Sequence, residues 1–356
     1  MASFIDLFAG AGGFTAGLSR RGLRPVFAIE FDKAAAATYE ANFGSHVLAV
    51  DVKTVARFPK VDLVVGGPPC QGFSPLGTRQ TDDKRNELWR EYFRALRSAR
   101  PAVFVMENVP ELLKSQQFAE FRGLAQGLGY SIAERVLNSA DYGAPQKRRR
   151  AIVIGRRHGD PIFPRPTHSD PAKLGGKLKP WRTVREAFRG VPRTPDRTDL
   201  QGEGPHSSRR LHFGRTARSE SLERYRAVPA GGNRFDLQRN RPDLTPRCWL
   251  EKPSGSTDIF GRLRWDRPSV TIRTEFYKPE KGRYLHPDAD RPITHFEAAR
   301  LQGFDDTFVW AGSKIEIARQ IGNAVPVDLA RAIGGAVVRM LAGEVGEGQS
   351  EQLRLA

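Results

Sequence analysis

One cysteine of this sequence lies in a context that favours an accessible, reactive thiol over a side chain packed in the core. Residues 61–74 read VDLVVGGPPCQGFS, so an apolar stretch leads through two glycines and two prolines to Cys70. Cysteine is most often a small buried residue, but the prolines stiffen the chain here and a loop with Gly and Ser follows. Because such a segment presents a side chain rather than burying it, we predict that Cys70 is a nucleophile.

A carboxylate and two arginines are candidates to assist this thiol. Glu107 follows another apolar stretch, 102–106, and a carboxylate beside a nucleophile can handle a proton. The basic run QKRRR at 146–150 leads into a further apolar stretch. Alternate residues of a strand point the same way, so Arg148 and Arg150 are expected on one face. Taken alone, Glu107 could equally well be a surface acid. The basic run could equally well be a patch exposed to solvent.

A glycine-rich turn near the N-terminus is a candidate cofactor site. Residues 6–14 read DLFAGAGGF, and glycines at such a turn allow positive φ angles and close approach of a ligand. Thr15 stands where the dinucleotide-binding fingerprint has its third glycine, so that fingerprint is absent. Glu30 and Asp51 end the next two apolar stretches, where a carboxylate can bind ribose hydroxyls. The alternatives are a tight structural turn and an acid at a helix N-terminus.

These residues need a scaffold that gathers strand ends, and the chain alternates short apolar stretches with helical ones such as 33–42 and 88–99. This alternation predicts an α/β fold with a parallel sheet. Functional residues gather at the carboxyl ends of the strands in such sheets. The expected strands are Phe4–Phe8, Val26–Glu30, Val47–Val50, Val61–Val65, Ala102–Met106 and Ala151–Ile154.

The charge of the chain points to a polyanionic partner. Its 356 residues include 57 Lys and Arg against 40 Asp and Glu, for a net charge of +17. Residues 161–300 hold 29 of these basic residues and 17 of the acidic ones, so most of the excess lies there. This region is dense in Pro, Gly and Arg and is expected to be an irregular second domain or a set of loops facing nucleic acid. A halo of solvated arginines is the alternative.

Cysteine usage and hydropathy exclude several classes of protein. The two cysteines, Cys70 and Cys248, cannot form a disulfide framework and make a poor metal site. No stretch is apolar for long enough to span a membrane. We therefore expect a reducing, intracellular location, cytoplasmic and associated with the nucleoid, with no metal and no membrane partner.

Taken together, these motifs resemble the DNA (cytosine-5) methyltransferase family, of the prokaryotic restriction-modification or orphan type. Their order is the family's usual one: FAGAGG, PPCQ, ENV, QKRRR, a variable region, RPSVTIRT at 267–274, a helix at 294–301 followed by QGF, and GNAVP at 322–326. The match covers the whole chain except the variable region and the tail. One departure is Phe31 after Glu30, where some members carry Trp; an aromatic face is kept.

The resemblance implies a Rossmann-like S-adenosylmethionine-dependent methyltransferase sheet with a smaller, irregular target-recognition domain. The expected division is 1–160 with 315–345 for the catalytic domain, 161–314 for target recognition and hinge, and 346–356 for a flexible tail. The implied reaction transfers a methyl group from S-adenosyl-L-methionine to C5 of a flipped-out cytosine in a specific double-stranded DNA sequence, through a covalent adduct between Cys70 and C6.

Roles for single residues follow from the same resemblance. Glu107 would hold N3 and the exocyclic amine of the cytosine, Arg150 would contact the base oxygen, and Arg148 would steady the Glu107 side of the site. The segment 74–86 corresponds to a lid that closes over DNA. The implied cofactor contacts are Phe8, Gly10, Gly13, Glu30, Phe31, Asp51, Val52, Pro69, Leu88, Asn323 and Val325.

The expected partners are double-stranded DNA, bound by a monomer, and a cognate restriction endonuclease encoded nearby. Arginines of the variable region would contact phosphates or base edges, with Arg209, Arg210, Arg234, Arg239 and Arg262 as candidates. Three alternatives stay open: an RNA cytosine-5 methyltransferase of the DNA-enzyme type, a non-catalytic nucleic-acid-binding homologue, and a nicotinamide-dependent oxidoreductase. Intact PPCQ, ENV and QKRRR motifs argue against the second, and the missing third glycine argues against the third.

Overall fold

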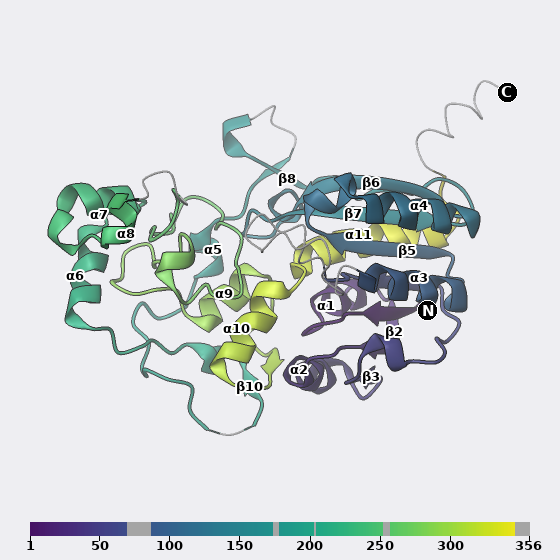
Figure 1. The fold of residues 1–356 in the computed structure, drawn as a ribbon, viewed down its shortest axis with the longest axis horizontal. Helices are drawn as coiled ribbons and strands as arrows, with labels where there is room; N and C mark the ends of the chain where they lie inside the picture. The colour runs from purple at the N-terminus through teal and green to yellow at the C-terminus, as the bar shows by residue number, and fades with distance from the viewer. Residues whose placement is uncertain (70–86, 174–177, 203, 252–256, 346–356) are drawn as a thin grey trace. The chain divides into compact units, whose positions relative to one another are not determined.

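The computed structural model describes residues 1–69, 87–173, 178–202, 204–251 and 257–345 (Figure 1). Cys70 and the segment 74–86 lie outside these residues. The chain forms two compact units: unit 1 comprises 1–142, 149–167 and 324–356, and unit 2 comprises 143–148 and 168–323. No helix of the described part is long and apolar enough to cross a membrane.

Unit 1 is built on a seven-stranded sheet, which confirms the predicted α/β class. In spatial order the strands are β3 (Val47–Leu48), β2 (Arg24–Ile29), β1 (Ser3–Leu7), β4 (Leu63–Gly66), β5 (Val103–Asn108), β7 (Arg149–Arg156) and β6 (Ser131–Asn138).

The prediction of a wholly parallel sheet is wrong at one strand. Strands β3, β2, β1, β4 and β5 pair in parallel, but β7 pairs antiparallel with both β5 and β6. Asn108 at the end of β5 is therefore opposite Ala151 near the start of β7. As a result, the beginning of β7 lies at the same edge of the sheet as the carboxyl ends of the parallel strands.

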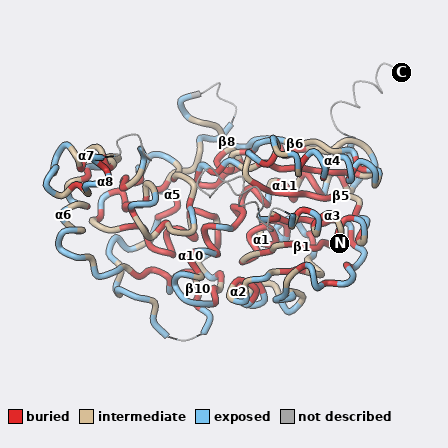
Figure 2. The backbone as a smooth tube through the Cα atoms, in the orientation of Figure 1, coloured by how far each residue is buried: buried red, intermediate tan, exposed pale blue. Residues whose placement is uncertain are grey.

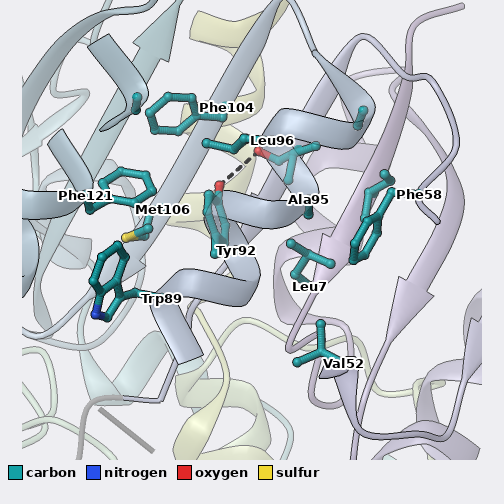
Figure 3. Packing of buried hydrophobic residues seen from close by; sticks show 14 of the residues in the cluster. Leu7, Val52, Phe58, Trp89, Tyr92, Ala95, Leu96, Phe104, Met106 and Phe121 are labelled. Atoms are coloured by element: carbon teal, nitrogen blue, oxygen red, sulfur yellow. Dashed lines mark hydrogen bonds between the residues drawn. The ribbon is translucent and has the colours of Figure 1, made fainter. Parts of the chain in front are cut away.

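Helices cover both faces of this sheet because alternate strand residues point to opposite sides. One apolar cluster contains Phe104 and Met106 and packs α3 (Leu88–Ala99) and α4 (Gln116–Gly127) on one face. Figure 3 shows Tyr92 of α3 close to Phe104 and Phe121, and its buried hydroxyl donates to the carbonyls of Val64 and Val105.

The opposite face packs against α1 (Gly13–Ser19) and α11 (Val327–Leu341), through a second cluster that includes Val103 and Val105. Helix α2 (Lys33–Phe43) follows β2 and begins at its N-cap Asp32, whose carboxylate accepts from the backbone of Ala34 and Ala35. Figure 2 shows most of the sheet as buried. The core therefore lies on both sides of the strands, and polar residues are left at their ends.

Unit 2 is irregular, with short elements and few long apolar runs. Its apolar cluster includes Tyr225, Trp249 and Phe260. Its strands are β8 (His168–Ser169), β9 (Lys179–Pro180), β10 (His206–Ser207) and β11 (Val309–Trp310). Its helices are α5 (Val184–Ala187), α6 (Ser219–Ala227), α7 (Arg234–Asn240), α8 (Arg247–Glu251), α9 (His295–Leu301) and α10 (Lys314–Asn323).

Candidate functional site

The end of β5 carries an ion pair that joins two predicted site residues. Arg150 Nε lies 2.9 Å from Glu107 Oε1, and both side chains are largely buried. Arg150 reaches Glu107 because β7 runs antiparallel to β5 and starts where β5 ends. A hydrogen bond between two ionised groups is stronger than a neutral one, so the pair fixes the direction of the Glu107 carboxylate.

The chain that leads into Cys70 is anchored to the same strand end. Asn108 Nδ2 donates to the carbonyl oxygen of Pro68 at 2.9 Å, and Asn108 is buried. A Cβ placed on Gly67 would lie only 2.9 Å from Glu107 Oε2, so the absence of a side chain there gives the carboxylate its room. Sequence analysis assigned no role to Asn108 or Gly67. The structure brings both against the predicted catalytic acid.

Arg148 lies just before the strand that carries Arg150, so the expectation that the two share one face of a strand stays a prediction. Strand β7 begins at Arg149, and the buried Arg148 precedes it. Within unit 2, Arg148 Nη1 donates to the carbonyl of Ile272 at 2.9 Å. The QKRRR motif passes from one compact unit into the other between Arg148 and Arg149.

Gln146 of the same motif ties segments of unit 2 together. Its Oε1 accepts from the backbone of Ile272 at 2.8 Å, and its Nε2 donates to Gln302 Oε1 at 2.8 Å. Gln302 in turn donates to the carbonyl of Ile321. A Cβ on Gly322 would lie 2.4 Å from the backbone of Arg273. Residues of the QKRRR, RPSVTIRT, QGF and GNAVP motifs therefore lie together around one buried hydrogen-bond network.

At Gly10, the glycine-rich turn has the geometry expected of a ligand-binding site. Phe8, Gly10 and Gly12 all have positive φ angles, of 57°, 55° and 84°. No atom of the described residues lies within 4 Å of a Cβ built on Gly10, so the turn borders open space in that part of the chain. Glu30 closes the other side: Oε2 accepts from the backbone of Gly10 at 2.7 Å and Oε1 from that of Asp32 at 2.8 Å. Burial raises the pKa of Glu30.

The remaining glycines of the turn serve packing. A Cβ on Gly12 would lie 2.3 Å from the ring of Phe43, and one on Gly13 would lie 2.5 Å from the carbonyl of Val325. Gly13 and Val325, both predicted as cofactor contacts, thus lie against one another within unit 1. Their position explains why glycine is needed at 13 without any ligand. Asn323 ends α10 in unit 2.

The other predicted cofactor contacts surround strand ends of unit 1. Phe31 follows Glu30 with its side chain 74% exposed, which is unusual for a large apolar residue. Asp51 caps the short 3-10 turn at 52–54 by accepting from the backbone of Lys53. Val52 is buried, Pro69 is exposed, and Leu88 begins α3, where it packs against the apolar cluster of that face.

Arg94 of α3 is a contact that sequence analysis missed. Its Nη2 donates to the carbonyl of Val52 at 2.7 Å and its Nη1 to that of Val55 at 2.6 Å. Its Nε pairs with Glu91 at 2.7 Å. One guanidinium therefore holds the turn that carries Asp51 and Val52. Its position one residue after an apolar one on an amphipathic helix gave no signal in the sequence.

A buried polar chain runs beneath the glycine turn. Thr15 Oγ1 donates to Asp6 Oδ2 at 2.8 Å and lies 3.0 Å from the hydroxyl of Tyr39, which lies 3.1 Å from His46 Nε2. Burial, opposed by the hydrogen bond from Thr15, raises the pKa of Asp6 to about 7. Desolvation also lowers the pKa of His46. This chain joins β1, α1 and α2, the three elements that frame the turn.

Two of the arginines predicted to meet nucleic acid are buried inside unit 2, and that prediction is wrong for them. Arg262 donates to the carbonyls of Val228, Ala289 and others and pairs with Asp290. Arg234 is 2% exposed. Arg209 and Arg239 are exposed, with side chains 74% and 73% accessible, and Arg210 is exposed as well. Among the described residues, no group of three or more His, Cys, Asp and Glu could hold a metal ion.

Comparisons with known proteins show which family this chain is similar to. A model of the C-5 cytosine-specific DNA methylase family matches residues 2–339. The type II methyltransferase M1.HphI of Haemophilus parahaemolyticus is 36% identical over 340 residues, which cover 91% of this chain and 83% of that protein. M.AgeI of Thalassovita gelatinovora is 31% identical, with 90% and 96% covered. The crystal structure described as that of a DNA modification methyltransferase encoded within an Escherichia coli prophage matches with a TM-score of 0.71 and 26% identity, covering 96% of this chain and all of that one.

Proposed function

The chain belongs to the C-5 cytosine-specific DNA methylase family, and we propose that it methylates a flipped-out cytosine in a specific duplex sequence through a covalent adduct of Cys70. The observation that carries this proposal is the Glu107–Arg150 pair at the end of β5, with Pro68, two residues before Cys70 in the sequence, held by a hydrogen bond from Asn108. Family membership rules out the oxidoreductase alternative. The non-catalytic alternative conflicts with a carboxylate whose orientation is fixed by an arginine.

The proposed chemistry starts from the poor nucleophilicity of cytosine C5. The thiolate of Cys70 adds its electron pair to C6, and the C5–C6 π electrons become available at C5. Glu107, which must take up a proton from solvent when the base enters, gives that proton to N3, and its carboxylate then accepts a hydrogen bond from the amine. Arg150, which already holds Glu107, donates to the base oxygen. After methyl transfer to C5, a base removes the C5 proton, the C5–C6 double bond re-forms and the thiolate leaves.

S-adenosylmethionine, the donor that this family uses, supplies an electrophilic methyl group when bound. Unit 1 fits such a ligand: Gly10 borders open space, Glu30 presents a carboxylate for ribose hydroxyls, and Phe31 exposes an aromatic face for adenine. We assign the adenine side of the site to Asp51, Val52 and Leu88. Phe8, Gly13, Pro69, Asn323 and Val325 complete the proposed set, Gly13 and Val325 through the packing that shapes the turn.

Duplex DNA is the proposed substrate and unit 2 its reader. A cytosine inside a stacked duplex is inaccessible, so the base must be flipped out, which costs a few kcal/mol. Phosphate contacts from exposed arginines offset this cost. We assign chemistry to the motif-bearing part of the chain, 1–160 with 315–345, and target choice to 161–314. We expect the protein to act as a monomer on nucleoid DNA in the cytoplasm. We also expect Arg148 to steady the Glu107 side of the active site, and a cognate restriction endonuclease to be encoded nearby.

Covalent trapping tests the proposal. In 5-fluorocytosine, fluorine replaces the C5 hydrogen that a base must remove before the thiolate can leave. Wild-type protein with S-adenosylmethionine should therefore form an adduct with such a duplex that is stable to denaturing electrophoresis. Cys70→Ala should form none and should methylate nothing, while retaining cofactor binding. The exposed Cys248 provides the matched control, since Cys248→Ala should trap normally. Methylation by Cys70→Ala would refute the mechanism, and trapping on RNA but not on duplex DNA would favour an RNA substrate.

A further inference from the structure

Unit 2 contains a strongly basic cavity of about 640 Å³ that none of the predicted arginines lines. The RPSVTIRT segment forms one wall, because Ser269 exchanges backbone hydrogen bonds with Pro145 and Lys147. The segments at 258–264 and 282–284 form the rest. Its charged lining residues, which we call the basic basin, are Lys147, Asp258, Arg264, Arg267, Arg273 and Arg283.

Arg283 is a fixed part of the basin wall. Its Nε lies 3.0 Å from Asp258 Oδ1, and its Nη1 donates to the carbonyls of Gly231, Gly232 and Arg262 at 2.8, 3.0 and 2.6 Å. The side chain is only 12% exposed. Although burial opposes the shift, the Arg283 guanidinium lowers the pKa of Asp258, so the single acid of the basin stays ionised and paired. Arg283 therefore uses most of its donors within the wall and neutralises Asp258.

Arg264 differs because its side chain is oriented while its donors stay accessible. The residue is exposed. Its stem crosses Gly231, where a Cβ would meet Arg264 Nε at 2.9 Å and its Cγ at 3.4 Å. Gly231 also has a φ of +69°, a backbone conformation that favours glycine, so the Arg264 stem lies against bare backbone there. Among the residues that the structure describes, the guanidinium makes one long hydrogen bond, 3.4 Å from Nη2 to the carbonyl of Gly231.

Two other basin cations, Arg267 and Arg273, lack this support, whereas Lys147 Nζ lies over the ring of Trp181, 4.6 Å from its centroid. Arg273 is exposed and has no ion pair with any residue that the structure describes. Arg267 lies 3.8 Å from Asp170 and 4.0 Å from Asp266, which are loose contacts for a half-exposed side chain. A mobile arginine supplies charge to a phosphate, whereas an oriented planar fork matches the two acceptors on the major-groove edge of guanine.

We propose that Arg264 is a specificity-determining residue that reads a guanine in the recognised sequence, while Arg273 contacts the DNA backbone without base preference. The inference rests on the proposed function, since it requires duplex DNA as substrate. Arg283 is a positioning residue that holds the turn at 231–232 on which the stem of Arg264 lies. Within one cavity, Arg283 thus has a positioning role and the guanidinium of Arg264 has a base-reading role.

Methylation of a duplex library randomised around the target cytosine tests this assignment, with base-resolution mapping as the readout. Arg264→Ala and Arg264→Lys should both relax one guanine position by roughly 5- to 150-fold, because both lose the bidentate fork. Arg273→Ala should weaken binding equally for all sequences and lower the salt slope by about one unit. Arg24→Ala, an exposed arginine at the start of β2 in unit 1 to which no DNA or cofactor contact is assigned, should change neither property.

The outcomes separate the two layers of the argument. If the wild type methylates no duplex, the proposed function fails before the basin is tested. If the wild type has a defined site and the folded Arg264→Lys variant keeps every position of it, the assignment of Arg264 is refuted. A uniform loss of affinity in Arg264→Lys, with site preference unchanged, would equally refute it and make Arg264 a phosphate contact.

Discussion

Arg150 Nε lies 2.9 Å from Glu107 Oε1, and this contact exists because one strand of the sheet runs against the others. In a wholly parallel sheet, the start of β7 would lie at the edge opposite to the end of β5. Reversal of β7 brings a basic motif and an acidic motif, more than 40 residues apart in the sequence, to one edge. The carboxylate is consequently oriented before any substrate binds.

Glu107→Gln should lower turnover by roughly two to four orders of magnitude, the usual scale for a group that handles a proton. The amide keeps the size of the side chain but loses its charge and its pairing with Arg150. DNA binding should change little. Glu111→Gln, at an exposed position four residues on, is the control and should behave like the wild type in the same steady-state assay. Turnover within a few-fold of wild type would remove Glu107 from the mechanism.

Gly67→Ala should lower turnover while leaving cofactor affinity unchanged. The new methyl group would lie 2.9 Å from Glu107 Oε2, so the carboxylate or the chain leading to Cys70 must shift. The φ angle of Gly67 is not positive, so the substitution introduces a steric contact without backbone strain. Gly123→Ala in α4 meets nothing within 4 Å and serves as control. Single-turnover methylation rates and calorimetric titration with S-adenosylmethionine would measure both effects; equal rates would show that Glu107 tolerates displacement.

Much of unit 1 could be predicted from the sequence because strand ends are local signals. The apolar stretches that end at Glu30, Gly66 and Glu107 are strands of the sheet. Strand direction is not local, so the reversal of β7 was missed. Strand β6 was missed for another reason: it lies at the edge of the sheet, and its sequence SIAERVLN carries charged residues with little apolar alternation.

The site residues of unit 2 were harder to predict because arginine looks alike in sequence whether buried or exposed. Arg262 lies in the same turn-rich stretch as Arg264, yet only its guanidinium is enclosed by carbonyls and Asp290. The pairing of 145–147 with Ser269 spans more than 120 residues and has no periodic signal. Only the folded chain distinguishes an internal tie from an accessible cation.

Asp6→Asn should change how stability depends on pH. Burial raises the pKa of Asp6 from 3.8 to about 7, so the folded protein holds a proton that the unfolded chain releases between these values. The resulting stabilisation is complete below about pH 3.8 and is lost as the pH rises through about 7. Asparagine cannot titrate. The melting temperature of the wild type should therefore fall relative to that of Asp6→Asn between pH 5 and pH 8; a constant difference across that range would show that Asp6 titrates normally.

Arg94→Met should weaken S-adenosylmethionine binding although Arg94 is assigned no contact with it. The guanidinium holds the carbonyls of Val52 and Val55, and hydrogen bonds from a charged group contribute about 1.5–3 kcal/mol each. Without them the turn carrying Asp51 loses its fixed position. Because the effect is indirect, we expect a loss of about 1–2 kcal/mol, roughly 5- to 30-fold in Kd. The KM for DNA should stay unchanged.

A purely structural role for Arg94 would lower the melting temperature without this selectivity, so both properties need measurement on the same variants. Arg97→Met, one turn along α3 at an exposed position, controls for the loss of charge and should bind the cofactor normally. Glu30→Ala supplies the reference for losing a direct contact. Arg94→Lys should recover part of the affinity, since an ammonium group can reach one carbonyl but not both. If Arg94→Met is folded at the assay temperature and binds with wild-type affinity, the turn holds its shape unaided and the adenine side of the site must be assigned to other residues.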